Sequence, residues 1–265
     1  MSVVVCLCTS AIIAVPVITP SCSLVEVTQT DMAEDDATTA LSVYLNAVEP
    51  ITSNDGYPAV VDGMAARLSE QLGGLWDVYS SGTAMSYSVY CVAYVELTGP
   101  QWLALLCKQS DKAGHVQMPC AALSLVSNGS LSRQHYFDAL QGRGAVDLPE
   151  TLADVELERF NSRWRDDSVE QRSDDNAAKE AALAVISAMP SSSVSSSVAS
   201  MLRHTLEGRF ASLPCRSRLP HLRCRWSVIV ETQPAGLQFS EAPGLQMSVR
   251  DPLGLMFLVQ RRQCQ

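Results

Sequence analysis

Histidine, cysteine and carboxylate side chains are the groups in this chain that could bind a metal or transfer a proton. The histidines lack the short spacings that metal sites use, and the nearest mixed pair, His115 with Cys120, is of a kind that is usually incidental. The acidic residues gather at expected helix starts and in loops, where a charge stays hydrated. We therefore expect no metal site and no cofactor. The four histidines are His115, His135, His204 and His221.

The local motifs of common enzyme classes are also missing from the sequence. It contains no G-x-G-x-x-G turn, no P-loop and no G-x-S-x-G nucleophile turn. A catalytic nucleophile or an acid–base pair needs partners that position and activate it, and no such group can be read from the spacing. The sequence favours a non-catalytic protein that acts by binding.

The composition is that of a folded protein with an uneven charge. The chain has 265 residues, of which 47% are hydrophobic, enough to bury a core. Its length leaves room for two domains of about a hundred residues each. The net charge of −9 makes nucleic acid an unlikely general partner. No Lys or Arg precedes Arg67, whereas nine arginines follow Met201.

The nine cysteines are interpreted as reduced thiols. Their number is odd, they form no C-x-x-C pair, and the chain is too long to depend on disulfides for its stability. Cys91 and Cys107 fall inside apolar runs, where a thiol behaves as a small hydrophobic group. This pattern favours a reducing compartment.

An amphipathic helix followed by apolar strands occurs twice in the chain. The apolar stripe of the first helix is Val60, Met64, Leu68 and Leu72, and that of the second is Val194, Val198, Leu202 and Leu206. The pair Gly73-Gly74 ends the first helix. A strand opening with tryptophan follows each helix, at Trp76 and Trp226, and a last apolar strand closes each copy. Chance recurrence is the alternative, but the shared order favours two domains of one kind.

Further elements are expected around these two helices. The apolar runs after Trp76, broken at Ser80–Thr83 and Thr98–Gln101, predict an antiparallel meander. In the second copy, Val155–Phe160 alternates like a strand, Arg163–Asp175 is expected to be a charged loop, and Asn176–Pro190 to be a helix.

The order of these elements resembles the smallest, homodimer-forming class of dynein light chains. The residues that carry the resemblance are Leu24–Met32, Ala37–Asn46, Trp76, Ser86-Tyr87 and Leu103–Lys108, together with Trp226–Val259 in the second copy. The resemblance implies an α+β fold of two tandem domains, each with two helices packed on an antiparallel sheet. It divides the chain into an apolar extension (1–23), a first domain (24–108), an insert or linker (109–150) and a second domain (151–265).

The resemblance also implies a function. Domains of this family pair by exchanging a strand, and the composite sheet edge takes up an extended client peptide as an added strand. The chain would then be a subunit or docking hub of a dynein or other cytoskeletal complex, in the cytoplasm or cytoskeleton, axoneme included. Its clients would be dynein intermediate chain or other extended peptides, and its two copies would pair as a pseudo-dimer.

The family pattern points to particular residues. The peptide-binding positions are Ala84, Met85, Ser86, Tyr87, Ser88 and Val89 in the first copy and Gly236, Leu237, Gln238 and Phe239 in the second. The domain-pairing positions are Trp76, Asp77 and Trp226. Asp77 stands at the family's interface histidine, and Val89 replaces a threonine that contacts the client. Client recognition is therefore expected to be altered or lost even where the fold persists.

Two segments carry open alternatives. Thr28, Gln29 and Thr30, followed by Asp31, spell the peptide that this family binds. They are either a plain first strand, or a segment that recruits another light chain or fills the protein's own groove. Arg216, Arg218, Arg223 and Arg225 lie in a loop that is either solvated or contacts an acidic partner. An RNA contact there gives the alternative function, a structural subunit of a ribonucleoprotein.

The apolar N-terminus has the length of a secretory signal peptide, which stays the alternative interpretation, but it lacks other features of one. Residues 1–20 lack the basic residues of a signal peptide, and a proline interrupts a run too short to span a bilayer. We expect an extra β-segment or a start-site extension here, and no membrane partner.

Overall fold

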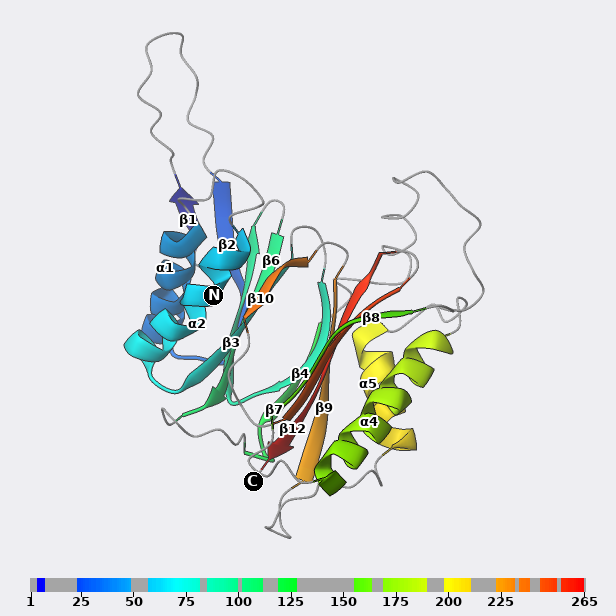
Figure 1. Ribbon diagram of the computed structural model, residues 1–265. Helices are drawn as coiled ribbons and strands as arrows, with labels where there is room; N and C mark the ends of the chain where they lie inside the picture. Colours follow the sequence, from blue (N-terminus) through cyan, green and yellow to red (C-terminus); the bar gives the residue numbers. More distant parts are fainter. Residues whose placement is uncertain are drawn as a thin grey trace.

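The computed structural model describes residues 4–7, 23–48, 57–81, 85–99, 102–111, 119–127, 155–163, 169–189, 198–210, 223–231, 234–238, 244–251 and 254–264. In these ranges the chain has an α+β fold with four helices and two six-stranded antiparallel sheets. The sheets face each other in the middle of the molecule, and one pair of helices covers the outer face of each (Figure 1). None of these helices combines the length and the hydropathy needed to cross a bilayer.

The N-terminal half runs from β2 to β6. The short strand β1 precedes it, and the short strand β7 follows it. The elements are β1 (Val4–Leu7), β2 (Ser23–Thr30), α1 (Glu34–Val48), α2 (Tyr57–Leu72), β3 (Leu75–Ser81), β4 (Met85–Cys91), β5 (Ala93–Gly99), β6 (Trp102–Ser110) and β7 (Leu123–Val126). Acidic residues in the first turn of α1 favour its start. Gly73 and Gly74 end α2 with φ angles of 66° and 81°, and a Cβ at Gly74 would lie 2.1 Å from the carbonyl oxygen of Ser110.

The C-terminal half repeats this order of elements. It contains β8 (Glu156–Arg163), α4 (Val169–Ser187), α5 (Val198–Arg209), β9 (Arg223–Glu231), β10 (Pro234–Gln238), β11 (Gly244–Arg250) and β12 (Met256–Cys264). The predicted stripe of the second helix starts at Val194, which lies outside the described residues, and α5 is described from Val198.

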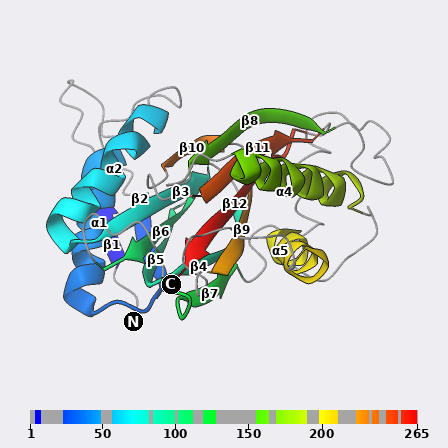
Figure 2. The ribbon, with the colours of Figure 1, turned by 60° about the horizontal axis from the view of Figure 1, so that its bottom comes forward.

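The two halves exchange one strand each. The strand order is β1-β2-β5-β6-β3-β10 in the first sheet and β7-β4-β9-β12-β11-β8 in the second. The C-terminal β10 therefore pairs with β3, and the N-terminal β4 pairs with β9 (Figure 2). Without β1 and β7 the two orders are the same, since β2, β5, β6 and β3 take the places of β8, β11, β12 and β9.

Three hydrophobic cores hold the layers together. One lies between each helix pair and its sheet, and the third lies between the two sheets. Trp76 and Trp226, expected at the contact between the domains, are buried instead in the cores between each helix pair and its sheet, with 1% and 3% of their surface exposed. Each lies under a basic side chain of the neighbouring strand: Lys108 Nζ is 5.8 Å from the Trp76 ring centroid, and Arg261 Cζ is 5.4 Å from that of Trp226.

The structure corrects two of the predicted local elements. The predicted meander after Trp76 is wrong. A bend at Val92 divides the expected strand into β4 and β5, and β4 joins the other sheet, where its side chains fill the core between the sheets. The predicted charged loop is helical from Val169, since the buried Asp175 accepts a hydrogen bond from Ser162 of β8 and anchors this turn. The expected extra β-segment at the N-terminus is present as β1, which pairs with β2.

The prediction of reduced thiols at Cys91 and Cys107 is wrong. These residues form a disulfide that joins β4 in one sheet to β6 in the other, across a Cα–Cα distance of 5.5 Å. A second disulfide, Cys120–Cys264, joins the segment before β7 to the end of β12. Cys224 is disulfide-bonded as well. The sequence did not indicate these bonds because the strand exchange creates the proximity.

Candidate functional site

The strand that carries the first set of predicted peptide-binding residues is an internal strand. One edge of β4 pairs with β9 over Met85–Ser88, and the other pairs with β7 over Ser88–Cys91. Ala84 lies outside the described residues. The prediction of an exposed edge at β4 is therefore wrong, because a strand of the insert already occupies it. The remaining predicted residues are all buried: Met85, Ser86, Tyr87, Ser88 and Val89.

Side chains as well as backbone hold β7 against β4. The Ser127 backbone N–H donates to the carbonyl of Tyr87 at 2.9 Å, and the Tyr87 N–H donates to Ser127 Oγ at 3.0 Å. From α5, Arg203 Nη1 donates to Ser124 Oγ at 2.5 Å. Leu125 is partly buried against the core between the sheets. Together these contacts close the β4 edge.

The same region of β4 is tied to the N-terminal turn of α5. The Ala199 backbone N–H donates to Ser86 Oγ at 3.3 Å, which satisfies one of the free donors at a helix start. Tyr87 donates through its hydroxyl to Glu96 of β5 in the opposite sheet. Burial, and after it the negative charge of Glu96, raises the pKa of Tyr87. Ser86 and Tyr87 therefore serve the packing of the two halves.

The second set of predicted peptide-binding residues lies on β10, at the end of the other sheet. Leu237 pairs with Tyr79 and Gln238 with Val78, while Phe239 lies outside the described residues. β10 packs beside α2, and within the described ranges β3 is its one strand neighbour. The outer side of β10, here called the β10 edge and containing Pro234–Gln238, has no strand neighbour among the described residues.

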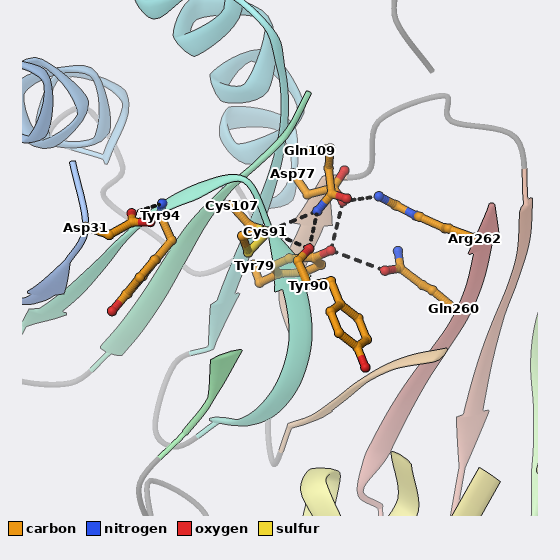
Figure 3. Close-up of a disulfide and its surroundings, with 10 residues drawn as sticks. All are labelled: Asp31, Asp77, Tyr79, Tyr90, Cys91, Tyr94, Cys107, Gln109, Gln260 and Arg262. Atoms are coloured by element: carbon orange, nitrogen blue, oxygen red, sulfur yellow. Dashed lines mark hydrogen bonds and ion pairs between the residues drawn. A yellow bond between two sulfur atoms is a disulfide. The ribbon is translucent and has the colours of Figure 1, made fainter. Parts of the chain in front are cut away.

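A buried ion pair joins the two halves between the sheets. Arg262 of β12 donates through Nη1 to Asp77 Oδ2 of β3 at 2.5 Å, and the Asp77 side chain is fully buried (Figure 3). The Tyr79 hydroxyl lies 2.9 Å from the same Asp77 oxygen and 3.2 Å from Gln260 Oε1. Since the hydroxyl has one proton, the charged carboxylate oxygen is its stronger acceptor. Asp77 thus lies at the contact between the halves.

The titration properties of this ion pair follow from its burial. Burial lowers the pKa of Arg262, but the negative charge of Asp77, the interaction with Tyr79 and the hydrogen bond to Asp77 together outweigh it and raise the pKa overall. Burial, followed by the negative charge of Asp77, raises the pKa of Tyr79 well above its ordinary value. Arg262 therefore remains charged and Tyr79 neutral across the physiological pH range.

Glu231 is a second buried ionisable residue where the halves meet. It is the last residue of β9, pairs with Met85 of β4 and Met256 of β12, and is 1% exposed. Neither of its carboxylate oxygens has a hydrogen-bond partner among the described residues. Burial raises the pKa of Glu231 well above 4.5, so the folded chain favours the neutral acid.

The arginines of the long loop are only partly described. Arg216 and Arg218 lie outside the described residues, and Arg223 begins β9. Arg225 lies over the ring of Tyr90, with Cζ 5.3 Å from its centroid, and Arg203 lies over the same ring at 5.0 Å. Arg225 thus makes an internal contact.

The Thr28–Thr30 segment forms the last part of β2. Thr28 Oγ1 donates to Glu96 Oε1 at 2.7 Å, and Thr30 Oγ1 donates to the carbonyl of Tyr94 at 2.8 Å. Gln29 is paired with Glu96 of β5. The segment is a first strand, so the hypothesis that it fills the protein's own groove is wrong. Recruitment of another light chain stays a prediction.

The sequence did not reveal the partner of Asp77 in the buried ion pair, or the strand that pairs with the outer edge of β4. Arg261 and Arg262 end an apolar strand, and charged residues inside such a run are the signal that could have pointed to a buried ion pair. β7 has four residues, too few to be recognised from the sequence as the occupant of an edge. In the part of the chain that the structure describes, no group of three or more His, Cys, Asp or Glu could hold a metal ion.

Comparison of the chain with models of protein families, with curated proteins and with solved structures found no match. Its function is therefore argued from its own geometry.

Proposed function

We propose that this chain is a non-catalytic docking subunit, built as two tandem dynein-light-chain-like domains, that binds an extended partner peptide at the β10 edge. The observation that carries the proposal is the reciprocal strand exchange: β4 pairs with β9, and β10 pairs with β3. In the family that the sequence resembles, two chains exchange strands in this way. Here a single chain supplies both partners and forms a pseudo-dimer.

The β10 edge is suited to an extended peptide because its binding groups belong to the backbone. Pairing with a strand edge depends on N–H and C=O groups, and side-chain pockets then provide specificity. The departures of this chain from the family pattern therefore affect the choice of client more than the mode of binding. Dynein intermediate chain and other extended peptides are the clients that the proposal names.

The disulfides bear on where the protein acts. Disulfide bonds persist in oxidising compartments and are rare in the cytosol. In a cytoplasmic or cytoskeletal assembly the chain would therefore be in its reduced form. The disulfides Cys91–Cys107 and Cys120–Cys264 would form in an oxidising compartment. The ribonucleoprotein alternative has less support, because Arg225 is engaged with Tyr90.

The proposal is tested by titrating the chain with a labelled peptide that contains Thr-Gln-Thr. In an antiparallel pair, successive N–H groups point alternately toward and away from the partner strand. Two peptides, N-methylated at alternate residues, form a matched pair: one loses the bonds to the β10 edge and the other keeps them. We expect saturable binding of the unmodified peptide and of only one methylated peptide.

Variants of β10 provide the control on the protein side. Leu237 and Gln238 are neighbours, so the N–H of one points to β3 and that of the other points outward. Of Leu237→Pro and Gln238→Pro, one should lower stability and the other should abolish binding while the fold remains intact. Strand addition would be contradicted if both methylated peptides bound equally well. It would also be contradicted if no peptide bound at about 1 mM, a concentration that corresponds to a binding free energy of roughly 4 kcal/mol.

A further inference from the structure

The two exchanged strands differ in what lies beside them. β10 is the last strand of its sheet among the described residues, whereas β4 is followed by β7. β7 comes from the insert and has no counterpart among the described strands of the other sheet. The position that an added peptide would take on β4 is therefore filled by a segment of the same chain, as both ribbon views show (Figures 1 and 2).

β7 is a weakly embedded strand. It has four residues, and two of them, Leu123 and Ser124, are exposed, with 48% of Leu123 accessible to solvent. Leu125 is partly buried against the core between the sheets. Its backbone pairs with β4 from Ser88–Val126 to Cys91–Leu123. A strand with so little buried apolar surface belongs to the least stable part of a fold.

A disulfide bond next to β7 compensates for this weak packing. The Cys120–Cys264 disulfide fixes the chain three residues before β7 to the end of β12. Cys264 is fully buried beside Tyr90, which pairs with Ser124 of β7. The disulfide thus keeps β7 at a high local concentration next to β4, and a free peptide would have to compete with it.

We propose that β7 is a built-in occupant of the β4 edge, locked by the Cys120–Cys264 disulfide, and that a dithiol reductant unlocks it to expose a second docking edge. The use of that edge for an extended peptide rests on the function proposed above. The dithiol gives up two electrons and two protons as it closes to its own disulfide, and Cys120 and Cys264 each become a thiol.

Access favours reduction of this disulfide over the other. Cys120 is partly exposed, whereas Cys91 and Cys107 are both fully buried. Because exchange requires a thiolate to reach a sulfur atom, the Cys120 sulfur is the first that a reductant meets. The Cys91–Cys107 bond then stays closed and holds β4 in place while β7 is released.

The deciding experiment is amide hydrogen exchange of residues 88–91 in the full chain. The test protein carries Cys120→Ser with Cys264→Ser, and the control carries Cys91→Ser with Cys107→Ser, which removes a disulfide that does not hold β7. Wild type reduced until alkylation marks Cys120 and Cys264, but not Cys91 and Cys107, provides the same comparison without a mutation. We expect exchange at the outward amides to rise by at least about tenfold in the test protein and in reduced wild type. Unchanged exchange in both would overturn the proposal.

The labelled Thr-Gln-Thr peptide separates this inference from the proposed function. We expect one equivalent of peptide to bind oxidised wild type and two to bind the test protein. If exchange rises but neither protein binds peptide, the proposed function fails while the detachable strand stands. If exchange rises and both proteins bind one equivalent, β4 is overturned as a docking edge.

Discussion

Replacement of Asp77 by leucine is expected to destabilise the contact between the two halves more than a typical core substitution would. The Asp77 side chain is fully buried, and the guanidinium of Arg262 lies 2.5 Å from its Oδ2 atom with 9% of that side chain exposed. The variant Asp77→Leu leaves the buried guanidinium without this carboxylate, and it also removes an acceptor from the Tyr79 hydroxyl.

The size of the effect follows from the burial of the pair. Removal of one partner of a buried ion pair costs about 3–5 kcal/mol. For a protein of this size, 1 kcal/mol corresponds to about 2–4 °C in Tm, so the melting temperature should fall by roughly 6–20 °C. Replacement of both partners, as Asp77→Leu with Arg262→Met, should cost much less than the two single changes together, because no buried charge is left unpaired.

The assay is a double-mutant cycle measured by denaturant unfolding under non-reducing conditions. The single variants Asp77→Leu and Arg262→Met are compared with the double variant, and the coupling free energy is the departure from additivity. A coupling of about 2 kcal/mol or more is the expected result. Strictly additive variants, or single variants that each cost less than about 1 kcal/mol, would refute the reasoning that a buried ion pair locks the halves together.

Three further predictions concern single side chains. Ser88→Pro should lower stability by about 1–3 kcal/mol in thermal melts, since β4 has a partner strand on both sides and a ladder bond is lost either way; an unchanged Tm would contradict this. Burial raises the pKa of Glu231, so the stability it contributes is full below pH 4.5 and is lost as the pH rises through the folded-state pKa. Wild type should therefore lose stability relative to Glu231→Gln by up to about 1.4 kcal/mol per pH unit in that window, and parallel pH–stability curves would argue against it. Trp76→Ala and Trp226→Ala should each cost about 3–5 kcal/mol, and a shift of less than one degree in either melt would remove that tryptophan from the core.

Local sequence patterns predicted the parts of the fold that depend on local physics. The spacing of apolar residues placed α2, and the glycine pair placed its end, because burial of one face and relief of backbone strain act over a few residues. The buried tryptophans were found for the same reason. The α+β class was implied by the family resemblance, and the extra N-terminal strand was expected from the apolar N-terminal run.

The pairing of distant strands could not be predicted in this way. Met85 pairs with Glu231, and an alternating strand looks the same in sequence whichever sheet it joins. Cys120 and Cys264 are 144 residues apart, so their proximity exists only after the halves have docked. The family resemblance suggested strand exchange and placed Asp77 at the contact. It could not show that β7 fills the β4 edge.

The most direct test of the proposed docking function is hydrogen exchange of the β10 amides with and without saturating Thr-Gln-Thr peptide, measured on oxidised wild type. Strand addition protects one of the two neighbouring backbone N–H groups of Leu237 and Gln238, because one of them enters a new hydrogen bond while the other already faces β3. We expect slowed exchange at one of these two residues and no change in β4, where β7 is locked. Saturable binding that leaves all β10 amides unprotected would show that this edge is not the docking surface.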